Sequence, residues 1–178
     1  RYQNGFGRYT VADPEWESAY ITEFSMDDGD PWLIHIDAVP YYERLREYLK
    51  TTRVRVHGTN GDTGVLPLET LIVAYHGSYV SRFTSAKRRY ISHHALGTTT
   101  DVNATMAPNE NTSANSALID GEVRNLLAYI GVQTDAAAGQ YYDFTYSGSY
   151  RCTDFGVPET VINYLLYELA FYRAGFQW

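Results

Sequence analysis

The chain has 178 residues, a formal net charge of −7 and a single cysteine, Cys152. This length suits a single domain spanning residues 1–178, and one cysteine cannot form an internal disulfide. The acidic balance argues against a nucleic-acid partner, because a phosphate backbone is bound through clustered Lys and Arg. No apolar run approaches the roughly 20 residues that a membrane span needs. The first residues, RYQNGFGRYT, contain no methionine and no leader pattern, so we expect a processed or trimmed chain.

The first part of the chain predicts both helices and strands. Residues 15–24, EWESAYITEF, fit either a short helix or a strand, and residues 32–39, WLIHIDAV, fit a strand next to a proline at each side. Residues 40–51, PYYERLREYLKT, predict a helix, and residues 52–58, TRVRVHG, alternate with the period of a half-buried strand. The apolar stripe of the predicted helix consists of Tyr41, Leu45 and Tyr48 or Leu49.

The middle of the chain is less regular. Leu71–Tyr75 predicts a buried strand, and residues 98–104, TTTDVNA, alternate so that Thr99, Asp101 and Asn103 share one strand face. Residues 117–132, ALIDGEVRNLLAYIGV, have apolar positions at helical spacing. The aromatic stretch at residues 140–156 predicts a loop or an edge strand.

The clearest helix begins at Pro158 and ends at Gly175, which suits a C-terminal cap. The last residues, FQW, predict the start of a strand that the printed chain does not complete. Helices and strands mix without regular βαβ alternation, so the sequence predicts an α+β fold with a small antiparallel sheet flanked by helices.

The stretch ISHHALGTTTDVN, residues 91–103, carries the most specific chemistry. His94 and Asp101 lie seven residues apart across Gly97, which permits a bend. Imidazole nitrogen and carboxylate oxygen are both good zinc ligands, and a catalytic zinc site uses three protein ligands and one open position. His93 is a rival ligand from its chemistry alone.

The full pattern Ser92-x-His94-x-x-Gly97-x-Thr99-x-Asp101-Val102-Asn103 resembles a known signature, S-x-H-x-x-G-x-A-x-D-[IV]-N. This is the signature of the zinc D-alanyl-D-alanine carboxypeptidases and L-alanyl-D-glutamate endopeptidases, the VanY-like group of LAS-type metallopeptidases. Thr99 departs from it, since the family usually has alanine there. The resemblance covers residues 71–178 and leaves residues 1–70 uncovered.

The resemblance implies roles for four residues. His94, rather than His93, and Asp101 are metal ligands, and the cofactor is Zn²⁺. Arg82 binds a substrate carboxylate, a task that suits a guanidinium fork, and Ser92 binds substrate or braces the loop. The remaining histidines, His35, His57 and His76, are expected to be structural.

The family takes its general base and third ligand from a D/E-x-x-H motif shortly after a GF-x-W-G-G turn. This chain reaches GFQW, residues 175–178, and contains no D/E-x-x-H. We therefore expect the metallopeptidase core at residues 71–178 to be incomplete at its C-terminus, with the general base beyond Trp178.

The resemblance implies hydrolysis of peptide bonds in peptidoglycan stem peptides, either as a D-Ala-D-Ala carboxypeptidase or as an L-Ala-D-Glu endopeptidase. It also implies an extracellular, periplasmic or cell-wall location, or a phage endolysin. One alternative is a catalytically inactive cell-wall binding or structural module of the same fold. Another is a glycosidase that uses a carboxylate pair, for which Glu122, Asp143 and Asp154 are available acids. The oligomeric state is not indicated.

Overall fold

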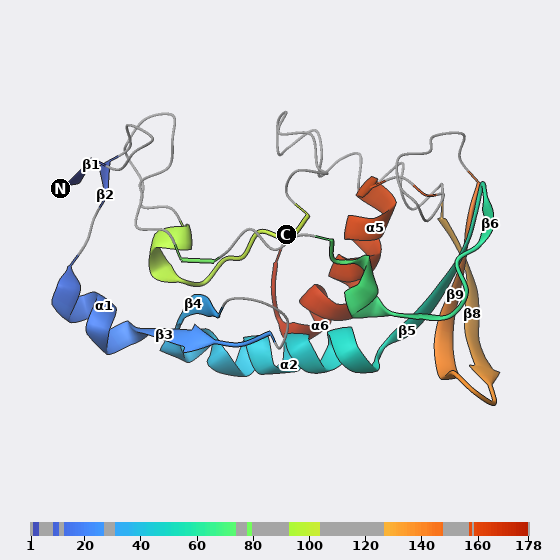
Figure 1. The fold of residues 1–178 in the computed structure, drawn as a ribbon, viewed down its shortest axis with the longest axis horizontal. Coiled ribbons are helices and arrows are strands. Elements are labelled where there is room, and N and C mark those ends of the chain that lie inside the picture. Colours follow the sequence, from blue (N-terminus) through green and yellow to red (C-terminus); the bar gives the residue numbers. More distant parts are fainter. Residues whose placement is uncertain are drawn as a thin grey trace. The chain divides into compact units, whose positions relative to one another are not determined.

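The computed structural model describes residues 2–3, 9–10, 13–26, 31–73, 78–79, 93–103, 127–147, 157 and 159–177. Helices and strands occur in mixed order (Figure 1), so the predicted α+β class is confirmed. The chain divides into two compact units, Arg1–Glu43 with Ala74–Val102, and Arg44–Val73 with Asn103–Trp178. Within the described part of the chain, no helix is both long and apolar enough to cross a lipid bilayer.

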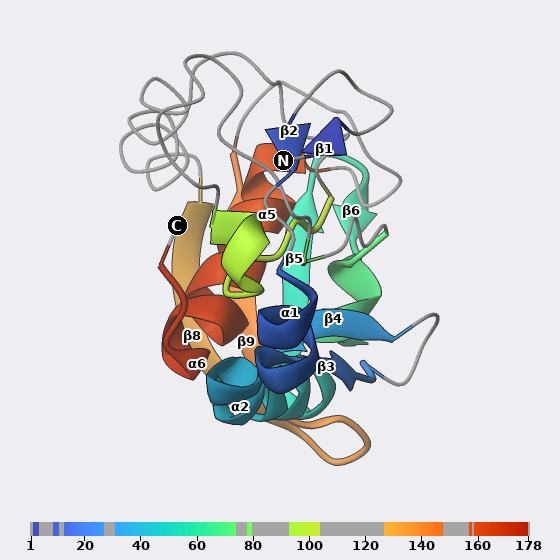
Figure 2. The ribbon, with the colours of Figure 1, turned by 90° about the vertical axis from the view of Figure 1, so that its left-hand side faces the viewer.

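The first unit contains two antiparallel strand pairs, β1 with β2 and β3 with β4. Figure 2 shows α1 beside the second of these pairs. The elements of this unit are β1 (Tyr2–Gln3), β2 (Tyr9–Thr10), α1 (Pro14–Tyr20), β3 (Ile21–Phe24), β4 (Trp32–His35), the 3-10 helices Ile36–Ala38 and His93–Leu96, and the first residues of α2 (Val39–Thr51).

Residues 15–24, which fit either a helix or a strand in sequence, contain all but the first residue of α1, followed by β3. The carboxylate of Asp13 caps α1 by accepting hydrogen bonds from the backbone N–H groups of Glu15 and Trp16. Pro14 occupies the first helical position, where its missing N–H costs nothing. The helix ends at Tyr20 because Ile21 is extended and begins β3.

Aromatic side chains from three elements form the core of the first unit. Phe24 from β3 and Trp32 from β4 are buried against Tyr42 of α2, with ring centroids 5.7 and 5.9 Å from that of Tyr42. Such tilted and edge-on arrangements are the favoured geometries of aromatic pairs. This core fixes β4, which in turn contacts the segment that carries the candidate metal ligands.

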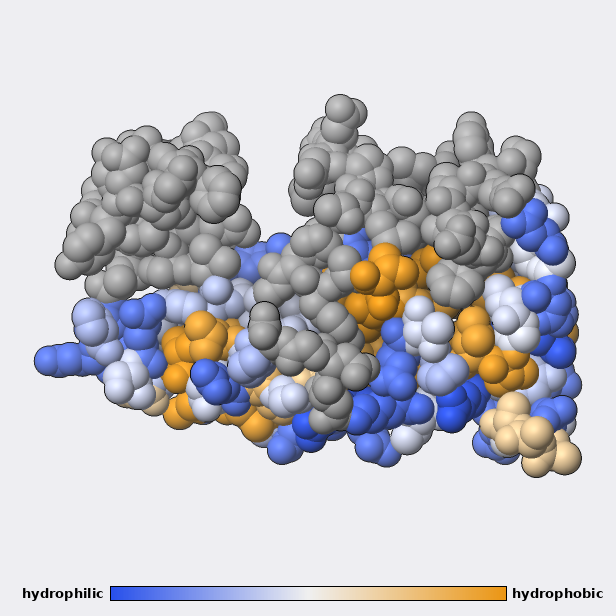
Figure 3. All heavy atoms as spheres, in the orientation of Figure 1, coloured by the Kyte–Doolittle hydropathy of each residue, from blue (hydrophilic) through white to orange (hydrophobic). Residues whose placement is uncertain are grey.

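Helix α2 buries one stripe made by Tyr42, Leu45 and Leu49. The predicted stripe contained Tyr41, which is wrong, since that side chain is 44% exposed. The correct positions step by three and four residues, as a helical face requires. Figure 3 shows mostly hydrophilic side chains over the C-terminal half of this helix, so α2 is amphipathic.

A five-stranded sheet dominates the second unit. Four strands follow the order β6-β5-β9-β8, and β7 also pairs with β5. The β5–β9 pairing is parallel, whereas the other pairings are antiparallel. The prediction of an antiparallel sheet is therefore wrong at this pair, because a long segment rather than a hairpin joins the two strands. The strands are β5 (Arg53–Gly58), β6 (Gly61–Asp62), β7 (Leu66–Pro67), β8 (Leu127–Asp135) and β9 (Gly139–Tyr146).

The predicted C-terminal helix is confirmed and lies against one face of this sheet (Figures 1 and 2). It consists of α5 (Glu159–Leu166), a π-helical turn (Tyr167–Phe171) and α6 (Tyr172–Ala174). Gly175 ends it with φ 104°, the left-handed conformation that favours glycine at a helix C-terminus. The guanidinium of Arg44 donates two hydrogen bonds, of 3.0 and 3.3 Å, to the carbonyl of Ala174, which satisfies a helix-terminal acceptor.

Several predicted elements take other forms. Residues 127–132, predicted as helix, belong to β8, and residues 140–146, predicted as loop or edge strand, belong to β9, which lies inside the sheet. A hairpin turn joins β8 to β9 and favours strands on both sides of it. The carboxylate of Asp135 stabilises this turn by accepting hydrogen bonds from the N–H groups of Ala137 and Ala138. Residues 98–101 form no strand, and a 3-10 helix, Leu68–Leu71, ends where a strand was predicted. Phe176 and Gln177 are not in a strand either.

Asn103 was predicted on a strand face and instead has φ 48° at the end of a turn segment. Its side chain is fully buried in the second unit. The amide oxygen accepts from the N–H of Val73, and the amide nitrogen donates to the carbonyl of Leu71 and to the side chain of Asn163. Asparagine is one of the few non-glycine residues that adopt this backbone conformation readily, and here it also satisfies one buried and one partly buried backbone group.

We expect Asn103→Ala to lower the free energy of unfolding by about 2 kcal/mol, since it leaves the buried carbonyl of Leu71 and the partly buried N–H of Val73 without these partners. Asn163→Ala removes only one of the three hydrogen bonds and should cost less. Urea denaturation of both variants measures the difference. Equal losses of stability in the two variants would show that the hydrogen bonds from Asn103 to the backbone of Leu71 and Val73 add no measurable stability.

Candidate metal centre

His94 and Asp101 come together in the first unit. His94 lies in the 3-10 helix His93–Leu96 and is buried, with a side chain that is 10% exposed. Its Nε2 atom is 3.3 Å from Oδ2 of Asp101, whose side chain is 45% exposed. One partner of the pair is thus fixed in the interior, while the other is accessible from solvent.

The other ring nitrogen of His94 determines how the ring is oriented. Nδ1 lies 2.8 Å from the backbone carbonyl oxygen of Ser78. A carbonyl oxygen only accepts hydrogen bonds, so this contact places the ring proton on Nδ1 in the neutral imidazole. Nε2 then faces the carboxylate of Asp101. Because a bare nitrogen lone pair would repel a carboxylate oxygen, this contact requires either a proton or a metal ion on Nε2.

The separation of the pair fits two ligands of one zinc ion. Two atoms about 2.1 Å from a tetrahedral zinc ion lie about 3.4 Å apart, close to the 3.3 Å between Nε2 and Oδ2. Without a metal the same contact is an ion pair or hydrogen bond between imidazole and carboxylate. Among the residues that the structure describes, no group of three or more His, Cys, Asp or Glu side chains is placed to hold a metal ion.

Gly97 allows the turn that carries His94 to lie close to β4. Its φ is +65°, and its carbonyl accepts a hydrogen bond of 3.0 Å from the N–H of His35. A Cβ atom at this position would be 2.6 Å from the nitrogen of His35 and 3.0 Å from the carbonyl carbon of Ile34. Both the backbone conformation and the lack of space therefore require glycine.

The segment between Gly97 and Asp101 is held by its side chains rather than by strand pairing. Thr98 donates a long hydrogen bond of 3.4 Å to the carbonyl of His93. Thr100 is hydrogen bonded to the hydroxyl of Tyr42, and burial raises the pKa of that hydroxyl while the Thr100 bond acts in the opposite direction. These contacts place the residues next to Asp101 on the aromatic core.

The remaining predicted residues fall in different places. Arg82 and Ser92, the predicted substrate-binding pair, lie outside the described residues, as does His76. His93 is exposed, in contrast to its neighbour His94. His35 has a local structural contact, because its Nδ1 accepts a hydrogen bond of 3.1 Å from the N–H of Asp37.

Comparison of the chain with models of known protein families, with curated proteins and with solved structures finds no match. The resemblance to the VanY-like group therefore depends on the motif residues themselves.

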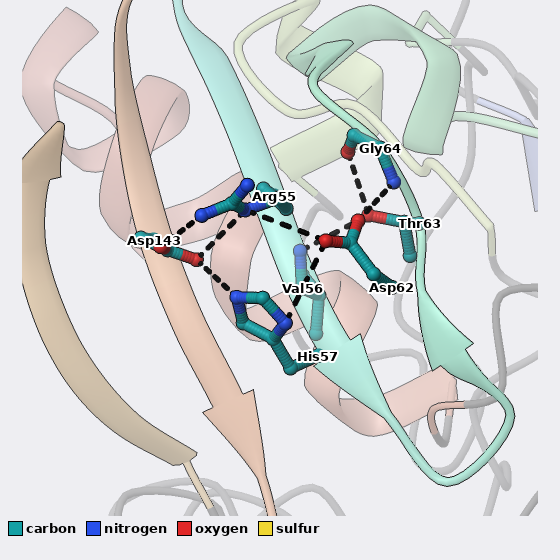
Figure 4. Close-up of polar contacts among 7 residues, drawn as sticks. All are labelled: Arg55, Val56, His57, Asp62, Thr63, Gly64 and Asp143. Atoms are coloured by element: carbon teal, nitrogen blue, oxygen red, sulfur yellow. Dashed lines mark hydrogen bonds and ion pairs between the residues drawn. The ribbon is translucent and has the colours of Figure 1, made fainter. Parts of the chain in front are cut away.

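A second polar cluster, which no sequence motif predicted, lies on the sheet of the second unit (Figure 4). The guanidinium of Arg55 donates to both carboxylate oxygens of Asp143, at 3.3 and 2.7 Å, and His57 Nε2 lies 2.8 Å from one of them. Asp62 approaches both Arg55 and His57 at 3.7 Å. Arg55 also lies over the ring of Tyr141, 4.9 Å from its centroid, a favourable cation–π arrangement.

Within this cluster, Asp143 is a structural carboxylate, because Arg55 and His57 occupy its oxygens. The hydrogen bonds and charge of Arg55, with a smaller contribution from His57, lower the pKa of Asp143 below its ordinary value of 3.8. Such a carboxylate stays ionised and paired, which does not suit the proton-donating acid of a glycosidase. The other two acids considered for that reaction, Glu122 and Asp154, lie outside the described residues.

We expect Asp143→Asn to lower the free energy of unfolding by about 1–2 kcal/mol at about pH 7, since it removes charge-assisted hydrogen bonds to partly exposed partners. A lowered pKa means that the stabilisation is complete above the ordinary aspartate pKa and is lost as the pH falls through the folded-state value. The difference between variant and wild type should therefore shrink as the pH falls below the ordinary aspartate value of 3.8. Urea denaturation across this range measures it.

The control for this prediction is Asp37→Asn, because the side chain of Asp37 is 86% exposed. This variant should be nearly as stable as wild type at each pH. A difference for Asp143→Asn that stayed constant down to about pH 2 would contradict the pairing with Arg55.

Proposed function

We propose that this protein is a zinc-dependent peptidase that hydrolyses peptide bonds in peptidoglycan stem peptides, with a core of the LAS metallopeptidase type. The activity is that of a D-Ala-D-Ala carboxypeptidase or of an L-Ala-D-Glu endopeptidase. Such an enzyme acts where peptidoglycan is found, at the cell wall or, for a phage endolysin, during lysis. The proposal combines the motif of residues 92–103 with the local geometry of its two candidate ligands.

The observation that carries the proposal is the contact between His94 and Asp101. The motif predicts that these two residues ligate one metal ion, and their side chains lie 3.3 Å apart with the histidine ring oriented by Ser78. The glycine of the same motif is required sterically at Gly97. Three positions of the motif thus have the local environments that a zinc site of this kind needs.

In the proposed site, His94 holds zinc through Nε2 and Asp101 through its carboxylate. When bound, zinc supplies an acidified water molecule and polarises the peptide carbonyl. Arg82 is proposed to bind the carboxylate of the stem peptide through its guanidinium fork, and Ser92 to bind substrate or to brace the loop. Burial of the His94 ring keeps one ligand rigid, which limits the ways in which the ion can be displaced.

His94 and Asp101 are the two proposed ligands among the described residues, whereas a catalytic zinc site uses three protein ligands. We propose that the third ligand and the general base come from residues outside those described, as the D/E-x-x-H motif does in the family.

Hydrolysis of defined stem peptides by the complete natural protein tests the proposal. A peptide ending in D-Ala-D-Ala should lose its terminal residue, or a peptide containing L-Ala-D-Glu should be cut at that bond, as detected by mass spectrometry. Removal of metal with a chelator should abolish the cleavage, and zinc should restore it. Binding of peptidoglycan without cleavage of either peptide would contradict the peptidase and would favour the inactive cell-wall module.

A further inference from the structure

Ser78 is almost completely buried, with 2% of its surface exposed, and it makes two different hydrogen bonds in the first unit. Its backbone carbonyl accepts from Nδ1 of His94 at 2.8 Å. Its side-chain hydroxyl donates to the backbone carbonyl of Leu33, in the middle of β4, at 2.5 Å. The residue therefore connects the histidine ring to a strand that the aromatic core holds in place.

The hydroxyl bond restricts the position of the carbonyl. A serine backbone without a side-chain anchor could rotate its peptide plane and move the carbonyl away from the ring. With Oγ fixed on the carbonyl of Leu33, a shift of the peptide would break a buried hydrogen bond, and an unsatisfied buried group is costly. The anchored side chain thus supports the contact that orients His94.

A second anchor acts on the next residue. The hydroxyl of Tyr79 donates to a carboxylate oxygen of Glu17, on helix α1. Ser78 and Tyr79 are therefore tied to two different elements, β4 and α1. Two anchors on consecutive residues fix the direction of the chain at this point, including the carbonyl that faces His94.

We propose that Ser78 is the positioning residue of the metal centre, because its anchored carbonyl accepts the Nδ1–H of His94 and so turns Nε2 toward Asp101. Nε2 is then the atom available to a metal ion, and it faces Asp101. This inference rests on the proposed function, because Nε2 of His94 is the proposed zinc ligand. Ser78 itself contacts neither metal nor substrate in this role and acts only through His94.

Nuclear magnetic resonance of the ¹⁵N-labelled histidine rings tests the inference in the metal-free protein. Wild type should show a proton on Nδ1 of His94 that exchanges slowly with water, because the anchored carbonyl of Ser78 accepts it. Ser78→Ala should speed this exchange and weaken zinc binding about tenfold, the usual effect of losing an outer hydrogen-bond partner. Ser78→Thr, which keeps the hydroxyl, should restore the wild-type signals.

Two further variants complete the test. Tyr79→Phe removes the second anchor without emptying a buried hydroxyl site, and it should speed the exchange of the Nδ1 proton by a smaller factor. Thr51→Ala, the control, removes a hydroxyl that also donates to a backbone carbonyl, at 2.8 Å on α2, and should leave the His94 signals unchanged.

A wild-type Nδ1 without a proton, or an exchange rate unchanged in both Ser78→Ala and Tyr79→Phe, would overturn the positioning role. Because the Nδ1 proton is observed without metal, this failure differs from a failure of the proposed function. A protein that shows the expected exchange rates but binds no zinc would overturn the peptidase and leave the anchoring of the ring by Ser78 standing.

Discussion

His94→Ala and Asp101→Ala are each expected to abolish stoichiometric zinc binding by the complete natural protein. Each variant removes one of the two candidate ligands, and a catalytic site with only two protein ligands left holds zinc weakly. Loss of an outer-shell partner already weakens metal binding by about 10–100-fold, so loss of a ligand should exceed this. Metal content by plasma mass spectrometry and competition titration with a chelator measure the effect.

The adjacent His93 provides a matched control, because it has the same chemistry and an exposed position. His93→Ala should retain zinc with wild-type affinity. Full zinc occupancy in His94→Ala or in Asp101→Ala would reject the assigned ligands, and loss of zinc in His93→Ala alone would assign the site to the neighbouring histidine.

Gly97→Ala is expected to lower the free energy of unfolding by about 3 kcal/mol and to weaken zinc binding in parallel. Part of the cost, about 1–2 kcal/mol, comes from placing an alanine in the left-handed region. The rest comes from the added Cβ, which would lie 2.6 Å from the backbone nitrogen of His35 and push the His94 turn away from β4. Thermal or urea unfolding and zinc titration measure the two effects.

Gly64 separates these two contributions. Its φ of +71° is nearly that of Gly97, yet a Cβ at this position would meet nothing within 4 Å. Gly64→Ala should therefore cost about 1–2 kcal/mol and leave zinc binding unchanged. Equal costs for the two variants would show that the close approach to β4 has no influence on the metal site.

Local patterns predicted two of the helices of this chain correctly and one, at residues 127–132, wrongly. The helix at α2 and the long C-terminal helix follow from apolar residues at helical spacing, and Gly175 caps the second of these as its position suggested. The stripe of α2 was misplaced by one residue at Tyr41 because tyrosine suits both a core and a surface. Such a shift cannot be resolved without knowing the opposing side chains, which are Phe24 and Trp32.

The sheet could be predicted only in part, because strand pairing depends on residues far apart in sequence. The alternation in β5 was recognised, and its Val54 and Val56 are buried as that pattern requires. Its parallel partner β9 lies far along the chain, so neither the pairing nor the contact between Arg55 and Asp143 had a local signal. Residues 127–132 fit a helix as well as a strand until the hairpin turn at Asp135 is taken into account.

The candidate site, like the sheet, could be predicted only in part from the sequence. The spacing of His94, Gly97 and Asp101 within one motif suggested that these residues act together, and the structure brings His94 and Asp101 into contact. The strand predicted for residues 98–104 does not form in the described part, since turn contacts of the threonines take its place. Ser78 had no signal at all, because its contribution to the site is a backbone carbonyl.

The most direct measurement of the central claim is X-ray diffraction at the zinc absorption edge from crystals of the complete natural protein. The anomalous difference map should contain one strong peak about 2.0–2.2 Å from Nε2 of His94 and from the carboxylate of Asp101. A zinc peak held by other residues, or no peak between these two side chains in crystals of protein that hydrolyses stem peptides, would contradict the proposed metal centre.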